Sequence, residues 1–264
     1  MSRMQSGGAH EGRSVVITGG TRGIGAGIAR AFLAAGSRVL VCGRNAPADP
    51  GLLPAAGGRT AVFCQADVRE PDQASRLVRT AADLFGRVDV LICNAGGSPE
   101  TPAATASPRF HAKIIELNLT APLQCAQAAF LVMQGQETGG SIIMIGSVSG
   151  TRPSPGTAAY GAAKAGLAHL VTSLAIEWAP KVRLNTVVPG FVATDGGAGH
   201  YGDAAATEAV AHSVPLQRMA TPDDVAAACL FLASPDAAYV SGASLLVHGG
   251  GEAPAFLALA HGSL

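Results

Sequence analysis

Short apolar runs rich in β-branched residues alternate with longer Ala- and Leu-rich segments along most of this 264-residue chain. The apolar runs are continuous, which is typical of parallel strands buried on both faces of a sheet. Their repeated alternation with helical segments predicts one doubly wound α/β domain, with about seven parallel strands and helices on both faces. The expected strands are 14–18, 38–42, 60–65, 88–93, 140–145, 182–188 and 243–247. The expected helices are 25–35, 71–85, 109–134, 157–179, 222–233 and a weaker one at 204–213.

The predicted dinucleotide-binding and catalytic domain covers residues 14–251, between a flexible N-terminus over 1–13 and a C-terminal tail over 252–264. Two segments, 96–108 and 191–218, interrupt the alternation just after strand ends, where open α/β sheets bind ligands. The second is glycine-rich at its start, so we expect it to form a substrate lid. Within it, His200, Tyr201 and His212 could line the pocket or face solvent. His248, near the C-terminus, is expected in a solvated turn.

Composition excludes several classes of protein. Lys plus Arg and Asp plus Glu both number 18, so the chain lacks the basic excess of a dedicated nucleic-acid binder. It contains no apolar run of about 18 residues that could cross a membrane, and no signal-peptide core at its start. Its five cysteines form no CxxC pair, which favours reduced thiols over a metal site. We therefore expect a cytoplasmic protein without a membrane, nucleic-acid or metal partner.

A glycine-rich turn joins the first strand to the first helix. The sequence TGGTRGIG occupies residues 18–25. Glycines in such a turn let the backbone approach a pyrophosphate, which the N–H groups of the following helix bind. The strand before and the helix after argue against a plain loop and predict a Rossmann-like dinucleotide site. The expected contacts come from Gly19, Thr21, Arg22, Gly23, Ile24 and Gly25.

The end of the second strand bears on which dinucleotide binds. NAD-preferring sites usually place an acidic side chain here for the ribose 2′-OH, but this chain reads VCGR over residues 41–44. Arg44, together with Arg22 in the glycine-rich turn, favours a 2′-phosphate and therefore NADP(H). If these arginines face solvent instead, NAD(H) remains possible.

Two further strand ends carry candidate cofactor contacts. Asp67 follows the third strand and could accept a hydrogen bond from the adenine amino group, although a turn or N-cap role fits its position equally well. The sequence NAGG at residues 94–97 follows the fourth strand. It is small enough for a ribose to lie against its backbone, and an ordinary turn is the alternative.

Three side chains suited to proton transfer follow the fifth strand. Ser147 comes at its end, Tyr160 lies thirteen residues later, and Lys164 is four residues further on the same helix face. An ammonium beside the tyrosine stabilises the phenolate form. Tyr160 could then give a proton to a carbonyl oxygen that receives hydride, or take one from an alcohol that loses it. Ser147 would hold that substrate oxygen by a hydrogen bond.

Together these motifs resemble the short-chain dehydrogenase/reductase family, from Ser14 to about Gly251. The resemblance also rests on ELN at residues 116–118 and on PGFVAT at residues 189–194. It implies an NAD(P)-dependent oxidoreductase that interconverts a secondary alcohol and a ketone in a single Rossmann-like domain. It also implies a water held by Asn118 that connects Lys164 to solvent, and a bond from Lys164 to the nicotinamide ribose. The implied catalytic tetrad is Asn118, Ser147, Tyr160 and Lys164. The implied cofactor contacts beyond the glycine-rich turn are Asp67, Val68, Asn94, Ala95, Gly96, Tyr160, Lys164, Pro189, Gly190, Val192 and Thr194.

The family's ketoacyl-carrier-protein reductases dock their acidic carrier on arginines, which this chain lacks. Residues 133–140 contain no basic side chain, and Ile176 stands where a second arginine is expected. A small ketone or alcohol is therefore the expected substrate, and a carrier protein is not an expected partner. Small residues on the Tyr-Lys helix suit close approach in a homotetramer or homodimer, or else a buried face within one chain. A catalytically silent dinucleotide sensor is the alternative function, which the intact Ser-Tyr-Lys set argues against.

Overall fold

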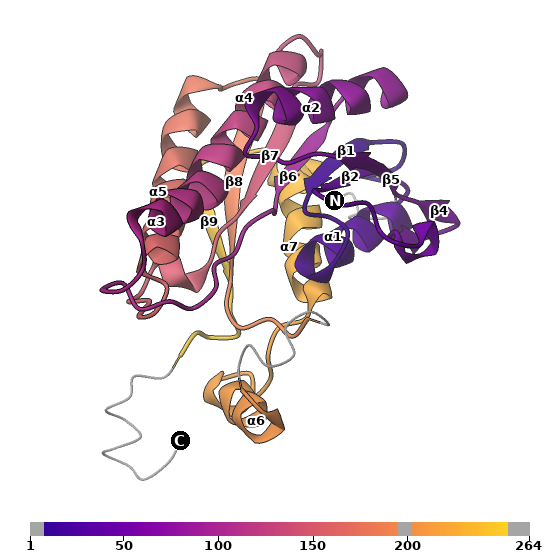
Figure 1. Ribbon diagram of the computed structural model, residues 1–264. Helices are drawn as coiled ribbons and strands as arrows, with labels where there is room; N and C mark the ends of the chain where they lie inside the picture. Colours follow the sequence, from indigo (N-terminus) through magenta and orange to yellow (C-terminus); the bar gives the residue numbers. More distant parts are fainter. Residues whose placement is uncertain (1–7, 195–201, 253–264) are drawn as a thin grey trace.

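The computed structural model describes residues 8–194 and 202–252, and its centre is a parallel sheet of seven strands (Figure 1). The strand order is β5-β2-β1-β6-β7-β8-β9. From β1, the chain first adds β2 and β5 on one side of the sheet and then β6 to β9 on the other, so the strand order reverses between β1 and β6. Such a reversal opens a crevice at the carboxyl ends of these two strands, where doubly wound sheets bind ligands. The predicted Rossmann-like fold is confirmed. The strands are β1 (Ser14–Thr18), β2 (Arg38–Gly43), β5 (Val62–Gln65), β6 (Val90–Cys93), β7 (Gly140–Ile145), β8 (Val182–Pro189) and β9 (Ser244–Val247).

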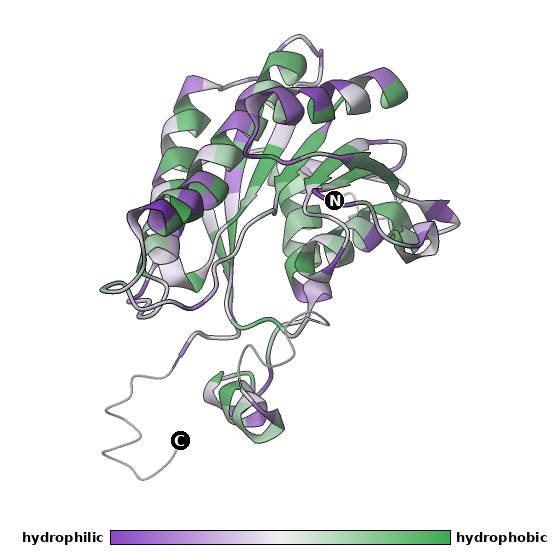
Figure 2. Cartoon of the chain, viewed as in Figure 1, coloured by the Kyte–Doolittle hydropathy of each residue, from purple (hydrophilic) through white to green (hydrophobic). Residues whose placement is uncertain are grey.

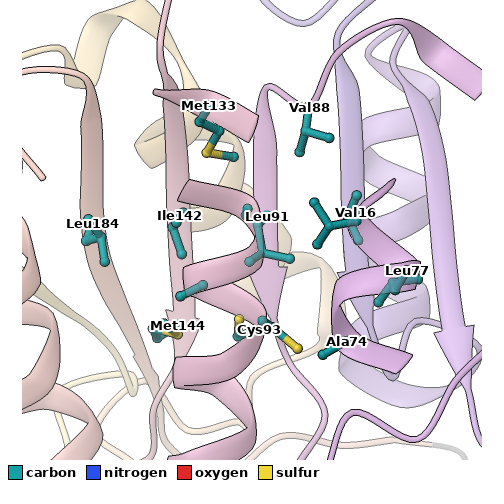
Figure 3. Packing of buried hydrophobic residues seen from close by; sticks show 14 of the residues in the cluster. Val16, Ala74, Leu77, Val88, Leu91, Cys93, Met133, Ile142, Met144 and Leu184 are labelled. Carbon is teal, nitrogen blue, oxygen red and sulfur yellow. The ribbon is translucent and has the colours of Figure 1, made fainter. Parts of the chain in front are cut away.

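Helices cover both faces of the sheet because successive strand side chains point to opposite faces. Val16, Leu91 and Ile142 are fully buried against one helical layer (Figure 3), whereas Val15 and Ile17 face the other. The central strands are accordingly apolar along most of their length (Figure 2). The first layer consists of α2 (Pro71–Phe85), α4 (Ala121–Met133) and α5 (Ala158–Glu177), and the second of α1 (Gly23–Ala34) and α7 (Pro222–Ala233).

The helix expected over residues 109–134 is the main departure in this part of the fold. It consists of α3 (Pro108–Ile115), a π-helical turn η2 (Glu116–Thr120) and α4. Pro122 has no N–H to donate to the carbonyl four residues earlier, and the N–H of Ala121 donates to the carbonyl of Glu116, five residues earlier. Single π turns of this kind are frequent at functional sites, and this one contains Asn118.

A small hairpin, which the sequence analysis missed, precedes the strand at the sheet edge. Thr60 was expected in that strand but pairs with Ala55 in an antiparallel ribbon of β3 (Ala55–Ala56) and β4 (Arg59–Thr60). Gly57 and Gly58 connect the two with φ values of +58° and +72°. Two successive residues with positive φ are what a type I′ hairpin turn requires, and glycine adopts them without strain.

The remaining segments differ in how closely they join the domain. Residues 8–13, which the sequence assigns to a flexible N-terminus, are anchored: His10 is buried edge-on against Phe32, and Arg13 donates to the carbonyl of Ala233. By contrast, α6 (Ala204–Ser213) lies apart from the sheet in Figure 1 and buries none of its residues. In the described parts of the chain, no helix combines the length and apolar character needed to cross a membrane. Within residues 8–194 and 202–252 there are also three short 3-10 turns: η1 (Pro50–Leu52), η3 (Val148–Gly150) and η5 (Pro235–Ala237).

Candidate active site

The predicted phosphate turn leads from β1 into the N-terminus of α1. Arg22 occupies the N-cap position without a side-chain cap bond, and the first turn of α1 contains no acidic residue. The first N–H groups of the helix therefore remain available to an anion. At Gly25, a Cβ atom would lie 2.3 Å from the carbonyl oxygen of Gly19 and 2.5 Å from Nδ2 of Asn94. Only glycine lets the turn close this tightly, so the residues present fit a dinucleotide pyrophosphate.

Asn94 joins the two strands that flank the crevice. Its Nδ2 donates to the carbonyls of Thr18 and Gly19, each at 3.0 Å, and its own N–H donates to Oγ1 of Thr18 at 3.0 Å. The N–H of Ala95 donates to the same hydroxyl oxygen at 3.0 Å. The side chain of Asn94 is thus committed to bracing the phosphate turn against the end of β6. Any contact of this segment with a ribose falls to its backbone and to the small residues that follow.

A cavity of about 410 Å³ opens beyond the ends of β2 and β5, and it contains two of the predicted cofactor residues, Arg44 and Asp67. Arg69, which the sequence analysis missed, binds Asp67 with its Nε 3.0 Å from Oδ1 and its Nη2 2.5 Å from Oδ2. These hydrogen bonds hold the pKa of Asp67 below its usual range and neutralise its charge. The other lining residues are Gln65, Gln73 and Arg76.

The two arginines predicted near the ribose occupy different positions. Arg44 is exposed and lines the cavity, where Arg76 from α2 adds a second guanidinium. Arg22 is exposed at the start of α1 and is absent from the lining of this cavity. A Cβ at Gly43 would lie 3.6 Å from Oγ1 of Thr21, so the loops that carry Arg22 and Arg44 adjoin each other. Arg76 gave no signal in the sequence because its place depends on how α2 packs over the end of β5.

Lys164 is buried beneath the predicted reaction centre, with 4% of its surface exposed. Its Nζ donates to the carbonyl of Ile145 at 2.8 Å and lies 5.6 Å from the centroid of the Tyr160 ring. Burial lowers the pKa of Lys164 to about 8, because the charged amine has lost most of its hydration. At neutral pH it is still mostly an ammonium, held one helical turn from the tyrosine.

Two glycines bring Ser147 onto the helix that carries Tyr160 and Lys164. A Cβ at Gly150 would lie 2.7 Å from the backbone nitrogen of Ala165, and one at Gly161 would lie 2.7 Å from the carbonyl oxygen of Ser149. The turn η3 therefore packs directly on the first half of α5. The Oγ of Ser147 accepts from the N–H of Ser149 at 3.1 Å, which orients the hydroxyl. Neither glycine was singled out from the sequence, since each acts through a contact between separate elements.

Asn118 is fully buried and links the π turn to the loop after β6. Its Oδ1 accepts from the N–H of Gly97, and its Nδ2 donates to the carbonyls of Gly97 and Ile114, all at 2.9 Å. A Cβ at Gly96 would lie 2.7 Å from Oδ1 of Asn118 and 3.3 Å from Nζ of Lys164. Asn118 and Lys164 therefore meet at Gly96, and the structure brings these two members of the predicted tetrad together.

The segment after β8 returns towards the phosphate turn. The N–H of Gly190 donates to the carbonyl of Val247 at 3.0 Å, and Cγ2 of Thr194 lies 3.6 Å from the position of a Cβ at Gly23. Residues 189–194 thus run along the crevice from the end of β8 to the start of α1. Val192, another predicted cofactor contact in this segment, is buried.

The four polar side chains left open from the sequence have different outcomes. His200 and Tyr201 lie outside the described residues. His212 is exposed, with Nδ1 2.9 Å from the carbonyl oxygen of Glu208. His248 was expected in a solvated turn but is half-buried, and its Cβ lies 2.8 Å from the position of a Cβ at Gly190. The close pairing of β8 with β9 explains this burial.

Comparisons with known proteins agree with this geometry. The family described as "Enoyl-(Acyl carrier protein) reductase" matches residues 19–252. A short-chain type dehydrogenase/reductase from Mycobacterium ulcerans has the same fold, with a TM-score of 0.84 and 30% identity over 91% of this chain and 90% of its own. The chain belongs to the short-chain dehydrogenase/reductase family.

Curated members of the family include dehydrogenases that are similar over nearly the whole chain. An L-rhamnose 1-dehydrogenase (NAD(P)(+)) of Azotobacter vinelandii is 38% identical and covers 90% of this chain and 96% of its own length. A 3beta-hydroxysteroid dehydrogenase 1 of Eggerthella lenta is 35% identical and covers 91% and 94%. The protein is accordingly an oxidoreductase of a family that uses NAD(P)(H), and dehydrogenases that act on CH–OH groups are among its relatives.

Proposed function

We propose that this enzyme is an NADP(H)-dependent oxidoreductase that interconverts a secondary alcohol and a ketone, with Tyr160 as the acid and base. The observation that carries the proposal is the buried ammonium of Lys164, 5.6 Å from the Tyr160 ring and bonded to the carbonyl of Ile145. An ammonium held in this position favours the phenolate and readies the tyrosine for proton transfer near neutral pH.

The chain's own residues account for binding and for the movement of the proton. The turn at residues 19–25 and the uncapped N-terminus of α1 would hold the pyrophosphate, and residues 189–194 would cover the nicotinamide end. When bound, the cofactor supplies or accepts the hydride. During ketone reduction, Tyr160 donates its phenolic proton to the carbonyl oxygen, while the hydroxyl of Ser147 hydrogen-bonds to that oxygen. During alcohol oxidation, the phenolate of Tyr160 accepts the hydroxyl proton.

Replacement of Tyr160 by phenylalanine tests the mechanism. The Tyr160→Phe variant should lose roughly 10²–10⁴-fold in ketone reduction, the usual contribution of a positioned acid. Its affinity for NADPH should stay within about twofold of the parent's, because the ring remains in place. The rate is followed by NADPH absorbance with a panel of ketones that includes cyclic, steroidal and sugar-derived compounds. Undiminished reduction by Tyr160→Phe would remove this residue from the mechanism.

The cavity beyond the ends of β2 and β5 is here assigned to the adenosine end of the cofactor and called the adenosine cavity. The charges around it support the preference for NADP(H). Arg44 and Arg76 line it, and its one carboxylate, Asp67, is already neutralised by Arg69. A 2′-phosphate would find two guanidinium groups there. The Arg44→Ala variant should bind NADPH about tenfold more weakly and NADH unchanged. Arg79→Ala, an exposed arginine of α2 outside the cavity, is the matched control. Equal NADPH affinity in both variants would leave NAD(H) as the better candidate.

We also propose that the enzyme acts in the cytoplasm, as a homotetramer or homodimer, on a free small molecule. Its five cysteines form no disulfide, which suits a reducing compartment. Ile176 stands where a carrier-docking arginine would be expected, which favours a free small molecule over a carrier-bound substrate. Ile176 is 82% exposed and Leu131 is 68% exposed, so apolar side chains are available to a second copy of the chain. Light scattering after size-exclusion chromatography measures the molar mass of the assembly. A monomeric mass at micromolar concentration would refute the proposed homotetramer or homodimer.

A further inference from the structure

Arg152 lies beyond the reaction centre, on the loop that joins Ser147 to α5. The loop turns back on itself, since the N–H of Arg152 donates to the carbonyl of Val148 at 3.1 Å. The guanidinium carbon lies 5.9 Å from the ring centroid of Phe191, the residue that follows Gly190. Its Nη2 lies 2.7 Å from Oε1 of Glu252.

These contacts join the segments that follow three neighbouring strands. β7 pairs with β8, and β8 pairs with β9, so their carboxyl ends lie side by side. The adenosine cavity is at the other side of the sheet, beyond β2 and β5. The phosphates of the cofactor belong at the start of α1, between these two regions. The nicotinamide end of the cofactor belongs along residues 189–194, and its carboxamide is uncharged. An anionic group that approaches Arg152 would therefore belong to the substrate.

The guanidinium of Arg152 has one buried nitrogen, Nε, for which the described residues provide no acceptor. Nη1 donates to the carbonyl of Pro153 at 3.1 Å, and Nη2 pairs with Glu252, but Nε is buried and has no acceptor among the described residues. Arg69 shows what this edge of a guanidinium can do, because its Nε and Nη2 bind both oxygens of Asp67. The same edge of Arg152 holds a single oxygen, and a buried charged donor without an acceptor is unfavourable.

Glu252 uses only one of the two donor nitrogens, Nε and Nη2, with which Arg152 could bind a carboxylate. Its side chain is 37% exposed, and ion pairs with such exposure contribute little to stability. It follows three consecutive glycines with positive φ, at residues 249–251. A ligand carboxylate that offers two oxygens could replace it at small cost and satisfy both Nε and Nη2.

We propose that Arg152 is a specificity-determining residue, which binds the carboxylate of a keto acid substrate, or of the corresponding hydroxy acid, in place of Glu252. The carbonyl end of the substrate would lie at Ser147 and Tyr160, and the carboxylate end would reach Arg152. This inference rests on the alcohol–ketone chemistry proposed above. It adds a charged group to the substrate class, where the sequence had left the substrate open.

The experiment compares each keto acid with its own neutral ester. Reduction of 3-oxobutanoate, 4-oxopentanoate and 5-oxohexanoate, and of their methyl esters, is measured at pH 7 as kcat/KM with NADPH. The parent enzyme should favour the best acid over its ester by tenfold or more. Arg152→Met should lower this acid-to-ester ratio by about 10- to 100-fold, the usual loss for a charge-assisted hydrogen bond. Glu252→Gln should raise it several-fold, because the competing carboxylate is gone. Arg79→Met, an exposed arginine of α2, should leave the ratio at the parent value.

A second measurement does not depend on turnover. Calorimetric titration of the same keto acids into the Tyr160→Phe protein saturated with NADPH should give dissociation constants at least tenfold higher once Arg152→Met is added. A parent enzyme that reduces the esters as well as the acids overturns the inference and leaves the proposed function intact. An equal loss for acids and esters in Arg152→Met does the same and makes this residue an anchor for the C-terminal segment only. Absence of turnover with every ketone overturns the proposed function, whereas absence of acid binding overturns the inference.

Discussion

Replacement of the buried Lys164 by methionine should stabilise the fold near neutral pH while it removes the activity. The pKa of Lys164 falls from 10.5 to about 8 because burial penalises the ammonium. At 1.36 kcal/mol per pKa unit, this burial costs about 3 kcal/mol of folding free energy at pH 7. Methionine has a similar length and no charge, but it gives up the bond to the carbonyl of Ile145, worth about 1 kcal/mol. The expected net gain is about 2 kcal/mol at pH 7.

The pH dependence separates this effect from ordinary repacking. Between pH 8 and pH 10.5 the unfolded chain binds more protons at Lys164 than the folded chain does, so the stability of the parent rises with pH. Lys164→Met lacks this group and does not share the rise. The difference in unfolding free energy between Lys164→Met and the parent should therefore fall by about 2 to 3 kcal/mol between pH 7 and pH 10, which removes the advantage of the variant.

Urea unfolding followed by circular dichroism at pH 7, 8, 9 and 10 measures the free energy of unfolding of both proteins. Lys113→Met, which removes an exposed lysine of α3, serves as the control and should track the parent at every pH. A difference between Lys164→Met and the parent that stays constant from pH 7 to pH 10 would refute the account of a buried, destabilising ammonium.

Three further outcomes are expected. Gly25→Ala should weaken NADPH binding tenfold or more in a fluorescence titration, because its Cβ would lie 2.3 Å from the carbonyl oxygen of Gly19; Gly135→Ala, with its nearest neighbour at 3.7 Å, is the control, and matching affinities would contradict the packing argument. Asn94→Ala should destabilise the domain by about 1–3 kcal/mol and lower its Tm by several degrees, because the side chain braces β1 against β6; an unchanged Tm would show that the brace contributes nothing. Arg69→Ala should reduce the preference for NADPH over NADH several-fold, because it leaves the carboxylate of Asp67 uncompensated beside the cavity. The dissociation constant of NADH divided by that of NADPH should therefore fall, and an unchanged quotient would exclude this role.

The sequence predicted the elements well where local pattern decides the structure. The bounds of the sheet strands lie within two residues of those expected, because a continuous apolar run suits a strand buried on both faces. The π turn at Asn118 and the hairpin at Gly57 and Gly58 were missed, although Pro122 and the paired glycines were visible signals. In each place the backbone could form more than one hydrogen-bond pattern, an α or a π turn at Asn118 and a strand or a hairpin near Gly57. The periodicity of apolar residues does not distinguish between these patterns.

The site was harder to predict wherever separate elements meet. Ser147, Tyr160 and Lys164 could be proposed from the residues because their spacing is local to one strand end and one helix. Asn118, in the π turn, came only from the family resemblance. The pairing of Arg69 with Asp67, and the packing of Gly150 on α5, depend on contacts that no run of residues announces. Asn94 illustrates the same limit: the prediction that a ribose lies against the backbone of residues 94–97 says nothing of its side chain, whose amide donates to the carbonyls of Thr18 and Gly19.

Helix α6 buries none of its residues, and this has a consequence for how the enzyme can evolve. A substitution on an exposed surface usually changes stability by less than about 0.5 kcal/mol, whereas truncation of a buried leucine costs about 2–5 kcal/mol. Mutations can therefore accumulate in α6 at almost no cost to folding, while the sheet and its two helical layers tolerate few. Directed evolution of substrate range would lose the fewest clones to misfolding if its libraries were confined to residues 204–213.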